Sequence, residues 1–386
     1  MGGGGHERGR LRKAVERFAG LLYRISGDIA GSIMMPGRGS SQGTTMPITL
    51  RVFLGGLALI ALGIAGLGAL AGPAHRGVVI GFQTGVDPGK LAQASGAYER
   101  ALGVPVTWRK FDSGTDLITA LAAGDVDIGD LGSSPLAIAA TRQLPIQTVV
   151  LISRLGRTEA LVARKDAGIM RPADLIGKRV AVPFVSTCHY SLLAALHHWG
   201  IPASAVQIIN LSPPQIAAAW ARGDIDAAYV WDPALGALKR NGRVLVGSDD
   251  VAGWGSPTYD AWVVRRDYAK AHPAVVGAFV NVTLDAVRDW RRRRDALTPA
   301  SAEVRAVAGI TGANPEDVPA LFANNAYPDA TAQAGPDLLG GGLARDLAAT
   351  AAFLKTQGKV DRVLVDYRPF IDARWVRAAA NRTEPK

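Results

Sequence analysis

Two short polar stretches stand directly before predicted helices, where they could hold an anion. One reads GSSP and contains Ser133 and Ser134; the other reads STCH and contains Thr187 and His189. The N-terminus of a helix carries about half a positive charge and unpaired N–H donors, so each stretch can accept an anionic group. Two such ends could close on one tetrahedral anion. Ordinary helix capping, which uses one hydroxyl per helix end, is the alternative interpretation.

Carboxylates and aromatic side chains gather at other predicted strand ends, where they could hold a cation. The candidates are Gln83, Thr84, Asp87, Trp231, Asp232 and Asp260. A carboxylate beside an aromatic face attracts an ammonium group through charge pairing and cation–π attraction. Together with the anion-accepting helix ends, these residues predict a zwitterionic ligand with an anionic head and an amino tail. Turn capping is the alternative role for Asp87 and Asp232.

Other reactive side chains are interpreted as structural. The Gly-Asp-x-Asp motifs at residues 124–127 and 223–226 come at turn-to-strand junctions, where aspartate commonly forms turns. The His197-His198 pair lacks the spacing of a zinc site. Cys188 and His189 are adjacent on a predicted helix, so their side chains point about 100° apart and are badly placed to share a proton. We therefore expect no metal site, no cofactor and no catalytic group.

A helix–turn–strand phrase occurs twice in the chain. Residues 120–135 read ALAAGDVDIGDLGSSP and residues 219–233 read AWARGDIDAAYVWDP. Each is a small-residue helix end, then Gly-Asp-x-Asp, then a short apolar strand that runs into polar residues and a proline. The repeated unit predicts two similar lobes. Strand ends that face each other across two lobes form a cleft in which a small molecule can bind.

Apolar runs alternate with helical segments along the body of the chain. Val78–Phe82 (VVIGF) is typical of a buried parallel strand, and Lys90–Leu102 is expected to form one helix. The alternation predicts a doubly wound α/β architecture. We expect lobe one over residues 77–164 and 267–386 and lobe two over residues 165–266. The segments 160–165 and 261–266 are expected to cross between the lobes, and two crossings form a hinge that allows closure on a ligand.

The composition is that of a globular protein with a modest basic excess. The 386 residues are 48% hydrophobic and 20% charged, and the formal net charge is +10. Half of that excess lies in residues 1–71, so the rest of the chain is too diffusely basic to indicate nucleic-acid binding. Cys188 is the single cysteine, so no intrachain disulfide can form.

The N-terminal residues are predicted to direct export. Residues 52–71 (VFLGGLALIALGIAGLGALA) are apolar or glycine, which is long enough for a membrane span or for the apolar part of a secretory signal. Ala69-Leu70-Ala71 is a small-x-small pattern typical of cleavage before Gly72. We interpret residues 46–71 as a signal peptide or signal anchor, and residues 1–45 as a non-native or disordered extension. In either case the body is delivered across a membrane to the periplasm.

Several phrases of the body are long and specific enough to indicate a family. They include GFQTGVDP, TWRKFDSG, GDLGSSPLAIAA, IAAAWARGDIDAAYVWDPA and WGSPTYDAWVVRRD. From residue 78 to about residue 370 the chain resembles the taurine-binding periplasmic proteins of bacterial ABC importers. The resemblance implies a two-lobed type II periplasmic-binding-protein fold, in which each lobe is a sheet flanked by helices and the ligand cleft lies between them. It also implies taurine as the ligand, delivered to a membrane permease paired with an ATPase.

The resemblance further implies roles for individual residues. The sulfonate contacts of the family fall on Ser133, Ser134 and Thr187. The amine partner falls on Asp260, with Trp231 and Asp87 as neighbours. The family commonly has glutamate where this chain has Asp87 and threonine where it has Cys188, and either difference could shift selectivity among sulfonates.

These observations predict an exported, monomeric solute-binding protein for taurine or a close aminosulfonate, and not an enzyme. The main alternative is a receptor for other alkanesulfonates or nitrate-like anions. Such ligands lack an ammonium group, which would leave Asp260 as an unpaired, desolvated carboxylate. Enzymes of the same fold that make the thiamine pyrimidine carry a cysteine-rich signature that is absent here, and the export leader also argues against that class.

Overall fold

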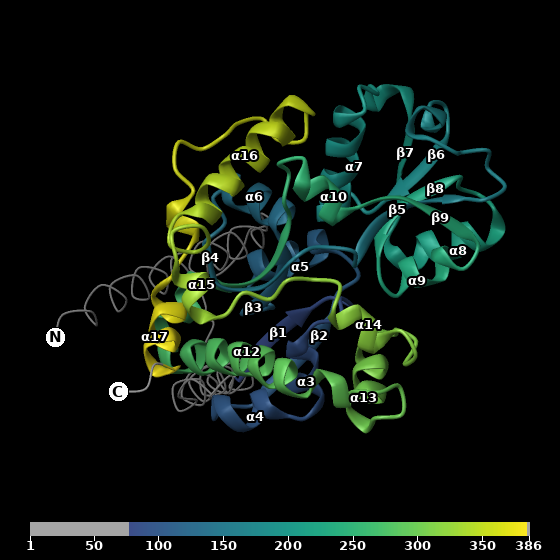
Figure 1. Cartoon of the computed structure of the whole chain (residues 1–386). Coiled ribbons are helices and arrows are strands. Elements are labelled where there is room, and N and C mark those ends of the chain that lie inside the picture. The colour runs from purple at the N-terminus through teal and green to yellow at the C-terminus, as the bar shows by residue number, and fades with distance from the viewer. Residues whose placement is uncertain (1–76, 384–386) are drawn as a thin grey trace, which may run out of the picture. The chain divides into compact units, whose positions relative to one another are not determined.

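The computed structural model describes residues 77–383, which lie within one compact unit, His75–Lys386 (Figure 1). The described strands form two five-stranded sheets, with the orders β2-β1-β3-β10-β4 and β7-β6-β8-β5-β9. We call the elements of the first sheet and the helices packed on it lobe one, and those of the second sheet lobe two. The leader predicted over residues 46–71 and the extension predicted over residues 1–45 lie outside the described residues.

The two sheets share one topology, because the strands at equivalent places run in equivalent directions. The first sheet contains β1 (Val78–Phe82), β2 (Val106–Lys110), β3 (Ile128–Gly132), β4 (Ile146–Arg154) and β10 (Tyr259–Arg265). The second sheet contains β5 (Glu159–Arg164), β6 (Arg179–Val182), β7 (Gln207–Asn210), β8 (Ala227–Trp231) and β9 (Gly242–Gly247). In each sheet three strands are parallel, and the fourth strand in the order is antiparallel to both of its neighbours. The prediction of two similar α/β lobes is confirmed.

Each sheet includes one strand from the part of the chain that the sequence assigns to the other lobe. The strand β5 was expected in lobe one but pairs with β8 and β9 in the second sheet. The strand β10 was expected in lobe two but pairs with β3 and β4 in the first sheet. Both strands are apolar on both faces, and such a run does not reveal its partners, since strand pairing depends on residues distant in sequence.

Helices cover both sheets, and the helices of lobe two lie around the second sheet (Figure 1). The helices of lobe one are α3 (Pro88–Ala94), α4 (Ala97–Leu102), α5 (Gly114–Ala123), α6 (Ser133–Thr141), α11 (Arg266–Ala271), α12 (Pro273–Arg293), α13 (Ala302–Thr311), α14 (Val318–Phe322), α15 (Ala330–Ala334), α16 (Gly342–Thr356) and α17 (Arg374–Thr383). The helices of lobe two are α7 (Thr187–His198), α8 (Pro213–Arg222), α9 (Ala234–Lys239) and α10 (Ser248–Gly253). Short 3₁₀ turns lie at Pro172–Leu175, Ala203–Ala205, Arg294–Ala296 and Arg368–Phe370.

The helix expected over Lys90–Leu102 is two helices in the structure. The break falls at Gly96, whose φ of 69° is in the left-handed region. Glycine adopts this conformation without a steric penalty, and it therefore commonly ends one helix before another begins. The break turns α4 relative to α3, so the buried face of each helix packs separately against α12.

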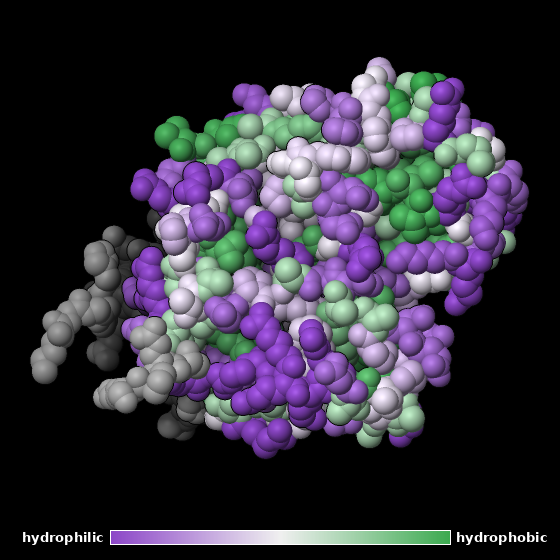
Figure 2. Space-filling model, viewed as in Figure 1, coloured by the Kyte–Doolittle hydropathy of each residue, from purple (hydrophilic) through white to green (hydrophobic). Residues whose placement is uncertain are grey.

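Both sheets are buried on both faces. In β6, Val180 and Val182 pack into one apolar cluster, whereas Ala181 packs into the cluster on the opposite face. Alternate residues of a strand point to opposite faces, so this pattern requires helices on each side. Among residues 77–383, no helix combines the length and the apolar character needed to cross a bilayer. Figure 2 shows a largely hydrophilic surface on the side viewed, with apolar groups gathered over lobe two.

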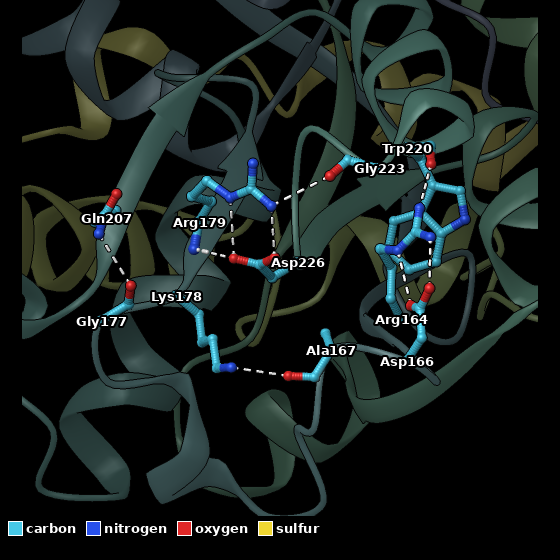
Figure 3. A network of polar contacts seen from close by, with 10 residues as sticks. All are labelled: Arg164, Asp166, Ala167, Gly177, Lys178, Arg179, Gln207, Trp220, Gly223 and Asp226. Carbon is cyan, nitrogen blue, oxygen red and sulfur yellow. Dashed lines mark hydrogen bonds and ion pairs between the residues drawn. The ribbon is translucent and has the colours of Figure 1, made fainter.

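The second aspartate of each Gly-Asp-x-Asp motif joins neighbouring strands. Asp127 Oδ2 accepts a hydrogen bond from the backbone N–H of Val79 at 2.9 Å, and Asp226 Oδ2 accepts one from that of Arg179 at 2.8 Å. Asp226 also accepts bonds from the Arg179 guanidinium at 3.2 and 2.8 Å (Figure 3). Each motif thus connects the strand that it begins to the adjacent parallel strand, in agreement with its structural interpretation.

Replacing Asp226 with alanine should destabilise the protein by about 1–3 kcal/mol, because the partly buried donors of Arg179 lose their acceptor. The hydrogen bonds from Arg179 lower the pKa of Asp226. This stabilisation is therefore present above the unfolded-state pKa and is lost as the pH falls through the lower folded-state value. Urea unfolding at neutral and acidic pH measures both effects.

Asp224→Ala is the matched control, since Asp224 belongs to the same motif but forms only an exposed ion pair with Arg222. We expect its effect on the free energy of unfolding to stay within about 0.5 kcal/mol. Similar losses for the two variants would contradict the assignment of the joining role to Asp226.

Candidate functional site

A cavity of about 50 Å³ lies where strand ends of the two lobes meet. Its polar lining residues are Gln83, Asp87, Asp130, Ser153, Thr158, Glu159, Ser186, Thr187, Trp231, Asp232, Asp260 and Asn325. A single water needs about 10–15 Å³ on this measure, so the cavity suits a ligand with few non-hydrogen atoms. Both lobes contribute to the wall, so a bound molecule would contact both.

The lobes touch each other at the edge of the cavity. Trp231 Nε1 of lobe two donates to Thr84 Oγ1 of lobe one at 3.2 Å, and that hydroxyl donates to the carbonyl oxygen of Asp232 at 3.3 Å. At a second contact, a Cβ atom added to Gly132 would lie 2.6 Å from Thr187 Cγ2. The absence of a side chain at Gly132 therefore allows Thr187 to approach, and the two lobes lie close together at the cavity.

The wall of the cavity is strongly acidic. Its carboxylates are Asp87, Asp130, Glu159, Asp232 and Asp260, and its lining includes no lysine, arginine or histidine. Behind the wall, the buried Lys90 places Nζ 3.1 Å from Asp87 Oδ2. Burial acts to lower the pKa of Lys90, but Asp87 and Asp130 outweigh it and raise this pKa. One buried cation therefore faces several carboxylates, and the cavity can attract a further positive charge.

Asp130 and Asp260 are the carboxylates most affected by their surroundings. Burial raises the pKa of Asp130 to about 6, against the opposing charge of Lys90. Burial also raises the pKa of Asp260 well above its usual value, and the charges of Asp130 and Glu159 add to this shift. Removal from water and mutual repulsion both disfavour the ionised forms, so an arriving cation would favour them.

Asp87 and Asp232 each cap a helix and line the cavity. Asp87 Oδ1 accepts the backbone N–H of Gly89 at 2.7 Å, and Asp232 Oδ1 accepts that of Gly236 at 2.8 Å. Asp232 Oδ2 has no hydrogen-bond partner, and burial raises the pKa of Asp232 to about 6. The capping interpretation therefore accounts for one carboxylate oxygen of Asp232 and leaves the other available.

The predicted hydroxyls at the helix starts are mostly engaged by the protein. Ser133 Oγ accepts the backbone N–H of Tyr259 at 3.2 Å, whereas the buried Ser134 Oγ has no partner. The Thr187 hydroxyl donates to Glu159 Oε1. Gly132, at the start of α6, and Thr187, at the start of α7, bring the two helix N-termini to the cavity wall. The starts of both helices therefore contribute to the cavity wall, together with the hydroxyl residues Ser186 and Thr187.

His189 and Cys188 lie in the first turn of α7 but outside the cavity wall. The His189 ring stacks on Phe184 with centroids 4.5 Å apart, and burial lowers the pKa of His189 to about 4. Burial and the neighbouring Glu159 raise the pKa of the Cys188 thiol well above its usual value. The imidazole is therefore neutral and the thiol protonated near neutral pH.

The structure brings six of the ten predicted site residues to the cavity wall: Gln83, Asp87, Thr187, Trp231, Asp232 and Asp260. Thr84 forms the contact between the lobes, and Ser133, Ser134 and His189 lie behind the wall. The polar wall residues that were not predicted include Asp130, Ser153, Thr158, Glu159 and Asn325. Asp130 could have been predicted from the sequence, since it lies two residues before Gly132 on the same strand. No sequence pattern could have indicated Asn325, because it follows α14, far along the chain from the other site residues.

Comparisons with known proteins relate this architecture to solute binding. The family model described as the substrate-binding domain of an ABC-type glycine betaine transport system matches residues 76–304. The taurine-binding periplasmic protein of Escherichia coli is 49% identical over 300 residues, which are 78% of this chain and 92% of that protein. A putative aliphatic sulfonates-binding protein of Bacillus subtilis is 28% identical, over 54% of this chain and 63% of its own length.

Among solved structures, the alkanesulfonate-binding protein of Xanthomonas axonopodis pv. citri bound to MOPS has a similar fold. Its TM-score is 0.64 at 24% sequence identity, and the match covers 76% of this chain and 97% of that one. At this identity the likeness establishes the fold alone. The fold of this chain is thus also that of a protein whose structure contains bound MOPS.

Proposed function

Because the chain belongs to the family of ABC-transporter substrate-binding domains, we propose that it captures taurine and presents it to a membrane permease coupled to an ATPase. One observation carries the choice of ligand. The cavity between the lobes combines an acidic wall with two helix N-termini, and taurine carries an ammonium group at one end and a sulfonate at the other. The relatives named above are binding proteins, and capture and release require no bond to be made or broken.

The ammonium end of the ligand is assigned to the carboxylates of the first sheet. Asp260 is its main partner, and Asp87 and Trp231 also line the cavity. A desolvated carboxylate and an aromatic face together stabilise an ammonium group. This assignment explains why burying so many carboxylates is tolerated: the bound cation compensates for their repulsion.

The sulfonate end is assigned to the N-termini of α6 and α7, at Gly132 and Thr187. The first backbone N–H groups of a helix have no partner within the helix, so they can donate to the sulfonate oxygens. Glu159 lies on this side, and both of its oxygens are occupied, by Thr187 and by Ser248 at 3.0 Å. Burial raises the pKa of Glu159, which favours its neutral form beside an anion.

Export to the periplasm belongs to the same proposal, since the relatives include a periplasmic protein. We assign the signal to residues 46–71, with cleavage before Gly72. N-terminal sequencing of the protein from cell extracts tests this assignment. A mature terminus near Gly72 would support it, and a retained residue 1 would overturn it in favour of an anchor.

Calorimetric titration with taurine and with ethanesulfonate tests the choice of ligand, because the two molecules differ by the ammonium group alone. We expect tight taurine binding and weak ethanesulfonate binding. Comparable affinities would indicate a receptor for alkanesulfonates in general. Glycine betaine, which carries a quaternary ammonium and a carboxylate, is the control for the wider family. Binding of glycine betaine without taurine would overturn the proposal.

A further inference from the structure

Asp130 has no assigned role, yet it is a buried carboxylate with a free oxygen at the cavity wall. The side chain is 5% exposed and lines the cavity, and its Oδ1 atom has no hydrogen-bond partner. Its backbone carbonyl accepts Gln83 Nε2 at 3.0 Å, and a hydrogen bond from the Gln83 backbone acts to lower the pKa of the carboxyl group, against the larger effect of burial. A buried acceptor without a donor costs free energy unless a ligand or a proton satisfies it.

The sheet register places Asp130 beside Asp260. The strands β3 and β10 are antiparallel, with Asp260 opposite Gly132 and Trp262 opposite Asp130. Asp130 and Asp260 are therefore diagonal neighbours on the same face of the sheet. Gly132 has no side chain opposite Asp260, and a Cβ atom there would lie 3.4 Å from Asp260 Oδ1 and 2.6 Å from Thr187 Cγ2. Both carboxylates line the cavity from the same face of the sheet.

The charges around this pair do not neutralise it. Lys90, on α3, is the cation that acts on both carboxylates, and it already forms an ion pair with Asp87. From β5, Glu159 adds a further acidic group, which acts on Asp260. The buried Tyr327 hydroxyl also faces the charges of Asp87 and Asp260, and it has no hydrogen-bond partner. The single positive charge of Lys90 therefore balances only one of the three carboxylates of Asp87, Asp130 and Asp260.

We propose that Asp130 and Asp260 form a two-carboxylate receptor for the ligand's ammonium group, that they hold one proton between them while the cleft is empty, and that capture of the ammonium expels this proton to solvent. The proposal rests on the proposed function, because it takes the ligand to be an amino-bearing sulfonate. Two close carboxylates in a low-dielectric site cannot both ionise unaided, so they titrate as a pair. The ammonium supplies the missing positive charge, and the carboxylic acid O–H bond then breaks to leave a carboxylate and a free proton.

Calorimetry of the wild-type protein in buffers of different ionisation enthalpy counts the expelled protons. At pH 6–7 we expect about one proton released per taurine bound, and no release with ethanesulfonate. The taurine association constant should accordingly rise by up to about tenfold per pH unit in this range, since an alkyl ammonium stays protonated there. Taurine binding without proton release, or equal release with both ligands, would overturn the inference. Absence of taurine binding would instead overturn the proposed function.

Asp130→Asn tests the pair directly, because it preserves shape and removes one titrating group. Loss of the Asp130 charge removes one of the causes that raise the pKa of Asp260, while burial and Glu159 keep part of that shift. The proton count for taurine should therefore fall below the wild-type value at pH 6–7. Asp337→Asn, which removes an exposed carboxylate outside the cavity, is the matched control and should keep the wild-type count. An unchanged count in Asp130→Asn would exclude Asp130 from the pair. If this variant does not fold or bind, the wild-type comparison of taurine with ethanesulfonate still decides the question.

Discussion

Replacing Asp260 with alanine should weaken taurine binding by about 2–4 kcal/mol, or roughly 30- to 700-fold in Kd. Asp260 lies on the cavity wall beside Asp130, opposite the side-chain-free Gly132. Removing it leaves the buried ammonium of the ligand without its main partner, and an unpaired buried charge is costly. Calorimetric titration of the variant with taurine measures the loss.

Ethanesulfonate provides the internal control for Asp260→Ala. This ligand has no ammonium, so the variant should bind it as well as the wild-type protein does, or more tightly, because a repelling carboxylate has been removed. Asp260→Asn should reproduce the selective loss without leaving a void. Equal losses of affinity for taurine and for ethanesulfonate would contradict the assignment of Asp260 to the ammonium group.

Gly132→Ala should weaken every ligand of the cleft to a similar degree, by about 1–3 kcal/mol or roughly 5- to 150-fold in Kd. The added Cβ would lie 2.6 Å from Thr187 Cγ2, across the contact between the lobes. The backbone itself accepts alanine, since the φ of Gly132 is −67°. The loss of binding free energy therefore comes from impaired closure of the lobes, and the affinities for taurine and for ethanesulfonate should both decrease.

A second substitution can restore closure, which makes this prediction specific. Thr187→Ser removes the Cγ2 atom that meets the new Cβ but keeps the hydroxyl that donates to Glu159. The double variant should recover most of the lost affinity. Gly309→Ala is the control, because the space around that exposed helical glycine is empty within 4 Å. Failure of the double variant to recover binding would show that Gly132 acts through something other than this contact.

The repeated phrase was sufficient to predict the fold class and the place of the site. Alternating apolar and helical patterns are local signals. The strands that they predict are present in the structure as β3, which is followed by α6, and as β8. Several candidates also followed from local signals, since polar residues after a buried strand tend to lie at the same sheet edge. Gln83, Asp87 and Trp231 were found in this way, and all three line the cavity. Asp260 also lines it, but it lies at the start of its strand, and its role was implied by the family resemblance.

Other features depended on contacts between residues far apart in the chain. The segments 160–165 and 261–266 were expected to cross between the lobes, but the sequence did not show which sheet β5 and β10 join, because an apolar strand carries no mark of its partners. Ser133 and Ser134, predicted at the anion end, do not line the cavity wall, and Ser133 Oγ accepts the backbone N–H of Tyr259. Their contact with a sulfonate stays a prediction.

The amino-acid sequence by itself therefore determined the two lobes, the cleft and a mixed acidic and anion-accepting chemistry, because these follow from short-range patterns. Only the tertiary structure decided which carboxylates share the cavity. Asp130 reaches Asp260 through the register of β3 and β10, and Glu159 reaches Thr187 through packing of β5 against α7. Charge coupling depends on distance through space, and the chain order does not encode that distance until the strands have paired.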